Sequence, residues 1–93
     1  MIERQIDVKN RLGLHARAAA QLVRLASRYK SVVRLERLDD SAAADAKSIL
    51  SVLMLAASRG TQLRVMTDGA DETEAMRAVC ALFADGFGES ERR

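Results

Sequence analysis

The only histidine of the chain stands in the segment GLHAR at positions 13–17, between a glycine-containing loop and an alanine-rich stretch. An uncharged imidazole is a nucleophile, and much of the imidazole population is uncharged near neutral pH. If His15 precedes the first turn of a helix, an anion carried by its ring lies at the positive end of the helix dipole. The unpaired N–H groups of Ala16, Arg17 and Ala18 would converge on that anion. The segment therefore indicates a histidine that can carry a phosphoryl group.

Other interpretations of His15 remain open from the residues alone. Inside the helix, the ring would pack in the core beside Leu22, and at the helix start it could act simply as a cap. The anion interpretation gains support from Arg17, whose guanidinium offers a fork of donors that suits phosphate oxygens. A metal site is not expected, because one histidine and one cysteine, Cys80, cannot supply an ordinary ligand set.

Ser48 is a second candidate for chemistry. We expect it to begin a helix that runs through Ser58 and is ended by Gly60. A serine in that place is most simply an N-cap, because its hydroxyl accepts a hydrogen bond from a free backbone N–H. The alternative is phosphorylation, whose added negative charge would alter docking more than folding.

The apolar arc of this expected helix is wider than contact with a sheet requires. We expect one face to comprise Ile49, Val52, Leu53 and Ala56, with Leu50 and Met54 outside it. Two interpretations follow: the helix is deeply buried, or part of its apolar surface docks a partner.

The elements that must position these residues follow from the hydrophobic pattern. Period-two alternation and turn residues predict strands over 3–9, 31–38 and 42–45 and a fourth around Leu63 and Val65, with helices over 16–29, 48–58 and 71–85. The order β-α-β-β-α-β-α predicts an α/β (α+β) two-layer open-faced sandwich, in which three helices cover one face of a four-stranded antiparallel sheet. Residues 1–88 are expected to form a single domain, and residues 89–93 a frayed charged tail.

Composition narrows the class of protein. Ninety-three residues, 48% hydrophobic and without proline, fit one compact domain. A net charge of +2 and 3% aromatic residues do not favour a nucleic-acid binder. The start of the chain lacks a signal-peptide pattern, and the most apolar segment, 49–57, is far shorter than the ~20 residues of a membrane span. We expect a cytoplasmic monomer without a cofactor or membrane insertion.

The stretch GLHARAA at 13–19 resembles the active-site signature of the HPr family, the histidine phosphocarriers of the bacterial phosphotransferase system. KSIL at 47–50 resembles the regulatory-serine motif of that family, at the family spacing. The likeness spans about 3–87, and the segments 51–55 and 82–87 resemble the nitrogen-related branch, NPr. The resemblance implies a carrier that turns over no small molecule.

The resemblance also implies roles for individual residues. It implies that His15 accepts phosphoryl at Nδ1 from the phosphohistidine of Enzyme I and passes it to an EIIA-type protein, while Arg17 stabilises the phosphate. It implies phosphorylation of Ser48 by HPr kinase/phosphorylase. The docking residues that it implies are Arg17, Arg24, Ile49, Leu50 and Leu53. Two alternatives remain: a non-transferring docking module that acts through Ser48, and a small basic RNA-binding domain.

Two positions depart from the family pattern. Ala18 stands where proline is common, and Leu12 where some members have a polar residue. Proline early in a helix fixes the entry angle, whereas alanine does not. The shape of the loop before His15 must then come from other residues, for which we expect an unusual backbone angle at Gly13 and a holding role for Asn10.

Overall fold

Strands and helices follow one another in the order β-α-β-β-α-β-α that the sequence predicts. The computed structural model describes residues 1–89 of the chain. Its strands are β1 (Ile2–Asp7), β2 (Val32–Arg37), β3 (Ala43–Asp45) and β4 (Gln62–Asp68). Its helices are α1 (Ala16–Ala26), α2 (Ile49–Met54) and α3 (Glu72–Ala84), followed by a short 3₁₀ turn, η1 (Gly86–Gly88).

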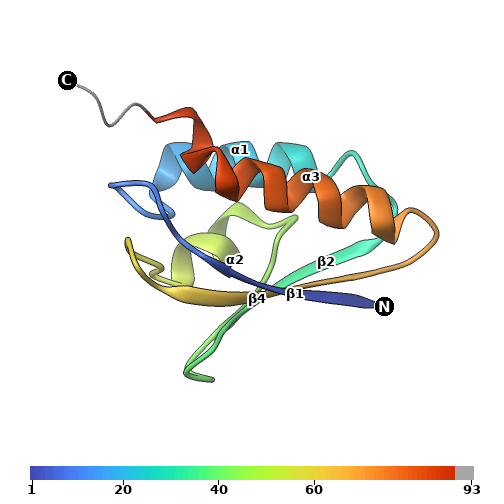
Figure 1. The fold of residues 1–93 in the computed structure, drawn as a ribbon, viewed down its shortest axis with the longest axis horizontal. Coiled ribbons are helices and arrows are strands. Elements are labelled where there is room, and N and C mark those ends of the chain that lie inside the picture. Colours follow the sequence, from blue (N-terminus) through green and yellow to red (C-terminus); the bar gives the residue numbers. More distant parts are fainter. Residues whose placement is uncertain (90–93) are drawn as a thin grey trace.

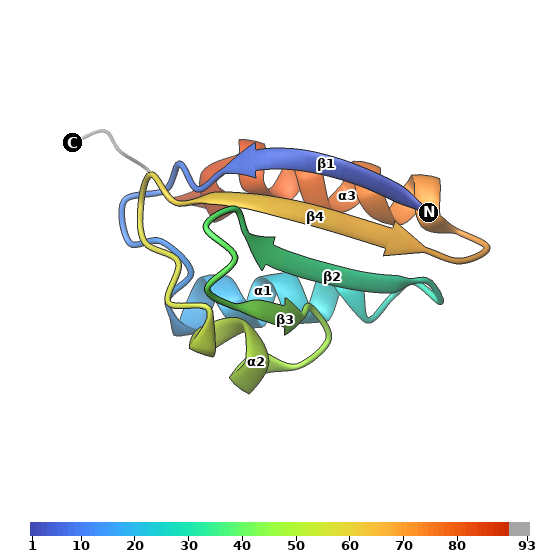
Figure 2. The same cartoon turned by 90° about the horizontal axis from the view of Figure 1, so that it is seen from below.

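The four strands form one antiparallel sheet in the order β1-β4-β2-β3 (Figure 2). Leu35 of β2 pairs with Val65 of β4, and both side chains are buried on the face that carries the helices. Their neighbours in the chain point the other way, because side chains alternate along a strand. On that open face, Arg64 Nη1 donates to Glu36 Oε1 at 2.8 Å. The predicted open-faced sandwich is therefore confirmed.

Helices α1 and α3 lie side by side over one face of the sheet, and the short α2 lies beside β3 (Figures 1 and 2). The residues that α1 buries are Ala18, Ala19, Leu22 and Ala26. The residues that α3 buries are Ala75, Met76, Val79 and Phe83. Several of these side chains are alanines, whose small size lets neighbouring backbones pack closely. The close backbone neighbours of α1 are α2 and α3, whereas those of α3 include β1 and β4.

Helix α2 is shorter than expected: it ends at Met54 rather than at Ser58. Gly60 lies in a later turn and does not end the helix. The reason is tertiary, because Leu55 and Ala57 are both buried and the backbone at Ala56 turns to φ 52° between them. A continuous helix would carry one of these two side chains away from the core.

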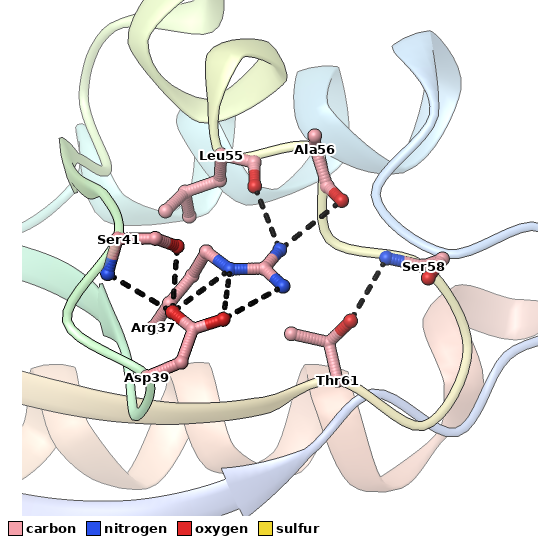
Figure 3. A network of polar contacts seen from close by, with 7 residues as sticks. All are labelled: Arg37, Asp39, Ser41, Leu55, Ala56, Ser58 and Thr61. Carbon is pink, nitrogen blue, oxygen red and sulfur yellow. Dashed lines mark hydrogen bonds and ion pairs between the residues drawn. The ribbon is translucent and has the colours of Figure 1, made fainter.

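Arg37 at the end of β2 binds the chain where α2 ends (Figure 3). Its Nη1 donates to the carbonyl oxygens of Leu55 at 3.0 Å and Ala56 at 3.2 Å, which satisfies acceptors that the helix leaves free. The guanidinium is itself held by Asp39. Hydrogen bonds from the Ser41 hydroxyl and N–H, together with Arg37, lower the pKa of Asp39 to about 2. The C-terminal end of α2 is therefore tied to the sheet.

Candidate functional site

Two hydrogen bonds hold the loop between β1 and α1: one lies within the loop, and the other joins it to the segment after α2. Asn10 is buried, and its Nδ2 donates to the Gly13 carbonyl oxygen at 2.7 Å. The Leu14 N–H donates to the Ala57 carbonyl oxygen at 2.8 Å. The expected role of Asn10 is confirmed, and these bonds hold the loop without a proline in place of Ala18.

Gly13 adopts a left-handed backbone, with φ 65°, as expected. A Cβ added here would lie 2.5 Å from the Ala57 carbonyl oxygen and 2.8 Å from the Ser58 Cα. Both the backbone angle and the close approach of the two segments therefore require glycine at this position.

His15 is the N-cap of α1, with an extended backbone (φ −73°, ψ 178°). Its carbonyl oxygen accepts the first helical hydrogen bond, from the Ala19 N–H at 2.8 Å. The N–H groups of residues 16–18 precede that bond and have no acceptor within the helix. The His15 side chain accepts from the Arg17 N–H, which confirms the capping interpretation. Because this side chain is 25% exposed, the interpretation as a core residue packed beside Leu22 is wrong.

The two ring nitrogens of His15 face different partners. Nδ1 accepts a hydrogen bond from the Arg17 N–H at 3.3 Å, so its lone pair points at the N-terminus of α1. Nε2 lies 2.7 Å from Oε2 of Glu89. The ring is thus held from both sides, with Nδ1 on the side of the free helix N–H groups.

Glu89 belongs to the site although no sequence motif points to it. The charged C-terminal sequence predicts that a frayed tail begins here, but the Glu89 side chain is only 14% exposed. Asn10 Nδ2 donates to its Oε2 at 2.8 Å, and the Leu12 N–H donates to its Oε1 at 3.4 Å. Burial raises the pKa of Glu89, but the hydrogen bonds from Asn10, His15 and Leu12 outweigh burial and lower it overall. The expectation for the tail is wrong at Glu89, and residues 90–93 lie outside the described part.

A packed turn brings Glu89 back to the start of α1. Phe87 in η1 is buried and adopts φ 58°. Its ring contacts that of Phe83 edge to face, with 4.9 Å between the centroids. The turn at the end of α3 consequently comes to lie beside the loop that precedes α1 (Figure 1).

A hollow of about 230 Å³ opens next to Glu89 and is lined by Arg11, Leu12, Arg17, Gly88 and Glu89. Arg17 is exposed and borders this hollow. Arg24 does not reach it. Instead, Arg24 lines a separate hollow of about 490 Å³ between α1 and α3, with Gln21, Leu25, Arg28 and Leu82.

Ser48 is the N-cap of α2, and its Oγ accepts a hydrogen bond from the Ser51 N–H at 3.3 Å. The capping interpretation is confirmed. Ser48 is half-buried, and the residue before it, Lys47, donates from Nζ to the Tyr29 carbonyl oxygen at 2.8 Å.

The apolar surface of α2 is partly exposed. Leu50 and Met54 are 68% and 73% exposed, which confirms that they lie outside the packed face. Ile49 and Ala56 are also exposed, contrary to expectation, because the shortened helix packs through Val52 and the chain beyond it turns away. The residue at the margin of this surface, Leu53, packs partly against the core.

Within residues 1–89, no group of three or more histidine, cysteine or acidic side chains could hold a metal ion. In the same part of the chain, no helix has the length and apolar character needed to cross a membrane.

Comparison with known proteins identifies the family. Residues 2–85 match the family model described as the PTS HPr component phosphorylation site. The chain is 48% identical to phosphocarrier protein HPr of Cupriavidus necator, over 98% of this chain and 100% of that protein. It is 39% identical to phosphocarrier protein NPr of Klebsiella oxytoca, over 95% and 97% of the two chains.

Comparison of the fold with solved structures points to the same family. A crystal structure of HPr from Thermoanaerobacter tengcongensis superposes with a TM-score of 0.91 at 39% identity, over 97% of this chain and 99% of that one. The chain therefore belongs to the HPr family of phosphocarrier proteins of the phosphotransferase system.

Proposed function

We propose that His15 accepts a phosphoryl group from the phosphohistidine of Enzyme I and donates it to an EIIA-type protein. The observation that carries this proposal is the orientation of Nδ1, an acceptor nitrogen aimed at the N-terminus of α1. Membership of the HPr family supports the same reaction class. We assign the carrier to the cytoplasm, as a monomer that needs no cofactor.

The helix N-terminus provides donors for the phosphoryl oxygens. When the Nδ1–phosphorus bond forms, the Arg17 N–H loses its acceptor and can turn to an oxygen of the new group. The N–H groups of Ala16 and Ala18 precede the first helical bond and can do the same. The exposed Arg17 guanidinium adds a charged fork of donors, so the phosphorylated state is stabilised where it forms.

Docking is assigned to α1 and α2. Arg17 and Arg24 are seven residues apart, so they project from the same side of α1, a helix without an acidic residue. Such a stripe attracts an acidic partner surface and speeds encounter. The apolar part of the interface is assigned to Ile49, Leu50 and Leu53 on α2. The exposure of Leu50 and Ile49 supports this assignment, because both are available for burial by a partner.

Ser48 is proposed as a regulatory site for HPr kinase/phosphorylase. Its neighbours Ile49 and Leu50 are exposed, so a phosphate on Ser48 would stand beside the proposed docking surface. That phosphate adds about −1.5 to −2 charge and would repel an acidic partner. In the alternative, the chain is a docking module that responds to Ser48 phosphorylation and transfers nothing.

The test is phosphorylation with Enzyme I and phosphoenolpyruvate. The proposal predicts an acid-labile, base-stable phosphate that is lost in His15→Ala and kept in Ser48→Ala. A label that persists in His15→Ala contradicts transfer through His15. Absence of any acid-labile phosphate in the wild-type protein favours the docking module.

A further inference from the structure

We propose that Glu89 is a positioning residue for phosphoryl transfer: its carboxylate keeps the proton of His15 on Nε2, so that Nδ1 remains the phosphoryl acceptor. The inference rests on the proposed function of His15. It extends the site to a residue 74 positions away in the chain.

Two independent contacts require the same tautomer of His15. An ionised carboxylate only accepts hydrogen bonds, so the proton in the 2.7 Å contact with Glu89 belongs to Nε2. On the other side of the ring, the backbone N–H of Arg17 donates, so Nδ1 carries a lone pair. Each contact therefore favours the form that the other one needs.

Glu89 is itself held in place by the loop before α1. Its Oε2 accepts from Asn10 Nδ2 at 2.8 Å, and its Oε1 accepts from the Leu12 N–H at 3.4 Å. Its backbone follows a turn anchored by the buried ring of Phe87. The carboxylate consequently has a defined direction toward His15, and the hydrogen bonds to it favour its ionised form.

Retention of the Nε2 proton helps both half-reactions. During acceptance, a bond forms between Nδ1 and phosphorus as the bond from phosphorus to the donor nitrogen breaks, and that electron pair returns to the donor ring. The His15 ring then bears positive charge, which the facing carboxylate stabilises. During donation, phosphorus bonds to the acceptor atom of the EIIA-type protein as the Nδ1–phosphorus bond breaks, and the electron pair of the broken bond returns to Nδ1. Because Nε2 has kept its proton, His15 leaves as neutral imidazole.

The negative charge of Glu89 would also repel an incoming phosphoryl group. Two cationic side chains, Arg11 and Arg17, line the same hollow as Glu89 and offset this repulsion. The carboxylate meets the ring at Nε2, whereas the phosphoryl group is proposed to join at Nδ1. The expected net effect of Glu89 is therefore faster transfer rather than electrostatic exclusion.

The test compares Glu89→Gln and Glu89→Asp with Glu74→Gln. Glutamine presents either an oxygen or an NH₂ group, so it does not select one tautomer. Glu74 is an exposed acidic residue in the first turn of α3, and its replacement changes the net charge by the same amount. Two quantities are measured: the ¹⁵N shifts of the His15 ring, and the rate of phosphoryl transfer from Enzyme I and to EIIA.

In Glu89→Gln we expect a mixture of the two His15 tautomers. Phosphoryl transfer should be slower by on the order of tenfold, which is the loss seen when a carboxylate that orients a metal-bound histidine is removed. The KM of Enzyme I for the carrier should stay unchanged. Glu89→Asp should restore part of the rate, and Glu74→Gln should behave as wild type. If Glu89→Gln disturbs the loop, Glu89→Asp still tests the proposal. In Glu89→Asp, the fraction of His15 with its proton on Nε2 and the transfer rate must both lie below the wild-type values, by parallel amounts.

If Glu89→Gln keeps the wild-type His15 tautomer and the wild-type transfer rate, the role proposed for Glu89 is wrong, while transfer through His15 is unaffected. A wild-type protein that takes up no phosphate from Enzyme I would instead overturn the proposed function, on which this role depends.

Discussion

The Nε2 atom of His15 lies 2.7 Å from Oε2 of Glu89, although the two residues are 74 positions apart. The contact joins the start of α1 to the turn after α3. The orientation of the histidine thus depends on both ends of the domain.

Arg17→Ala should slow phosphoryl transfer by roughly tenfold or more, because a charge-assisted hydrogen bond to the phosphoryl group is lost. The side chain is exposed, so the free energy of unfolding should change by less than about 0.5 kcal/mol. Transfer kinetics and urea denaturation measure the two effects, with the exposed Arg77 of α3, changed to alanine, as control. Equal losses of transfer in both variants would contradict a specific role for Arg17.

Gly13→Ala should destabilise the fold more than Gly60→Ala does. Both glycines have positive φ, 65° and 91°, so both changes incur backbone strain. Only at position 13 would the new Cβ also lie 2.5 Å from the Ala57 carbonyl oxygen, whereas nothing lies within 4 Å of a Cβ at position 60. We expect an excess loss of about 1–3 kcal/mol for Gly13→Ala in urea denaturation. Equal losses of unfolding free energy in the two variants would mean that the close approach to Ala57 does not contribute to the cost of Gly13→Ala.

Ser48→Ala and Ser48→Asp should separate the capping role of this serine from its charge effect. Alanine removes the cap and should lower the free energy of unfolding by about 1 kcal/mol, whereas aspartate caps as well as serine does. Ser48→Asp should therefore fold with near wild-type stability and bind Enzyme I more weakly, measured by calorimetry. Unchanged affinity in Ser48→Asp would argue against regulation through charge at this position.

Asp71→Asn should change how stability depends on pH. The Ser31 hydroxyl and the N–H groups of Lys30 and Ser31 donate to Asp71 and lower its pKa from 3.8 to about 2. Because the folded pKa lies below the unfolded value, the ionised carboxylate stabilises the fold above pH 3.8. That contribution is lost as the pH falls toward 2.

Asp71→Asn should consequently be less stable than wild type at neutral pH, with a difference that shrinks through this acidic window. Urea midpoints measured from neutral pH downward check the trend. The exposed Asp7, changed to asparagine, is the control. A difference that stays constant with pH would contradict the assigned cause.

The sequence pattern predicted the order of elements because each element carries its own signal. The alternation around Leu63 and Val65 defines β4, and the capping residues His15 and Ser48 define the starts of α1 and α2. The end of α2 has no such local signal. It is decided by the burial of Leu55, which depends on contacts with the rest of the fold.

The candidate site was predictable from the sequence only where its residues are close together in the chain. His15, Arg17 and Asn10 lie within one short segment, so the sequence places them together. Glu89 stands in a charged C-terminal segment that looks like a tail, and only the packing of Phe87 shows that it turns back. Contacts between distant parts of the chain have no periodicity that could have predicted this pair.

The identity of the phosphoryl acceptor atom, which we propose to be Nδ1 of His15, can be measured directly. The direct measurement is ¹⁵N and ³¹P NMR of the protein after reaction with Enzyme I and phosphoenolpyruvate. We expect a phosphorus coupled to Nδ1, with the proton retained on Nε2. Phosphorus bound to Nε2, or to no histidine nitrogen, would contradict this proposal.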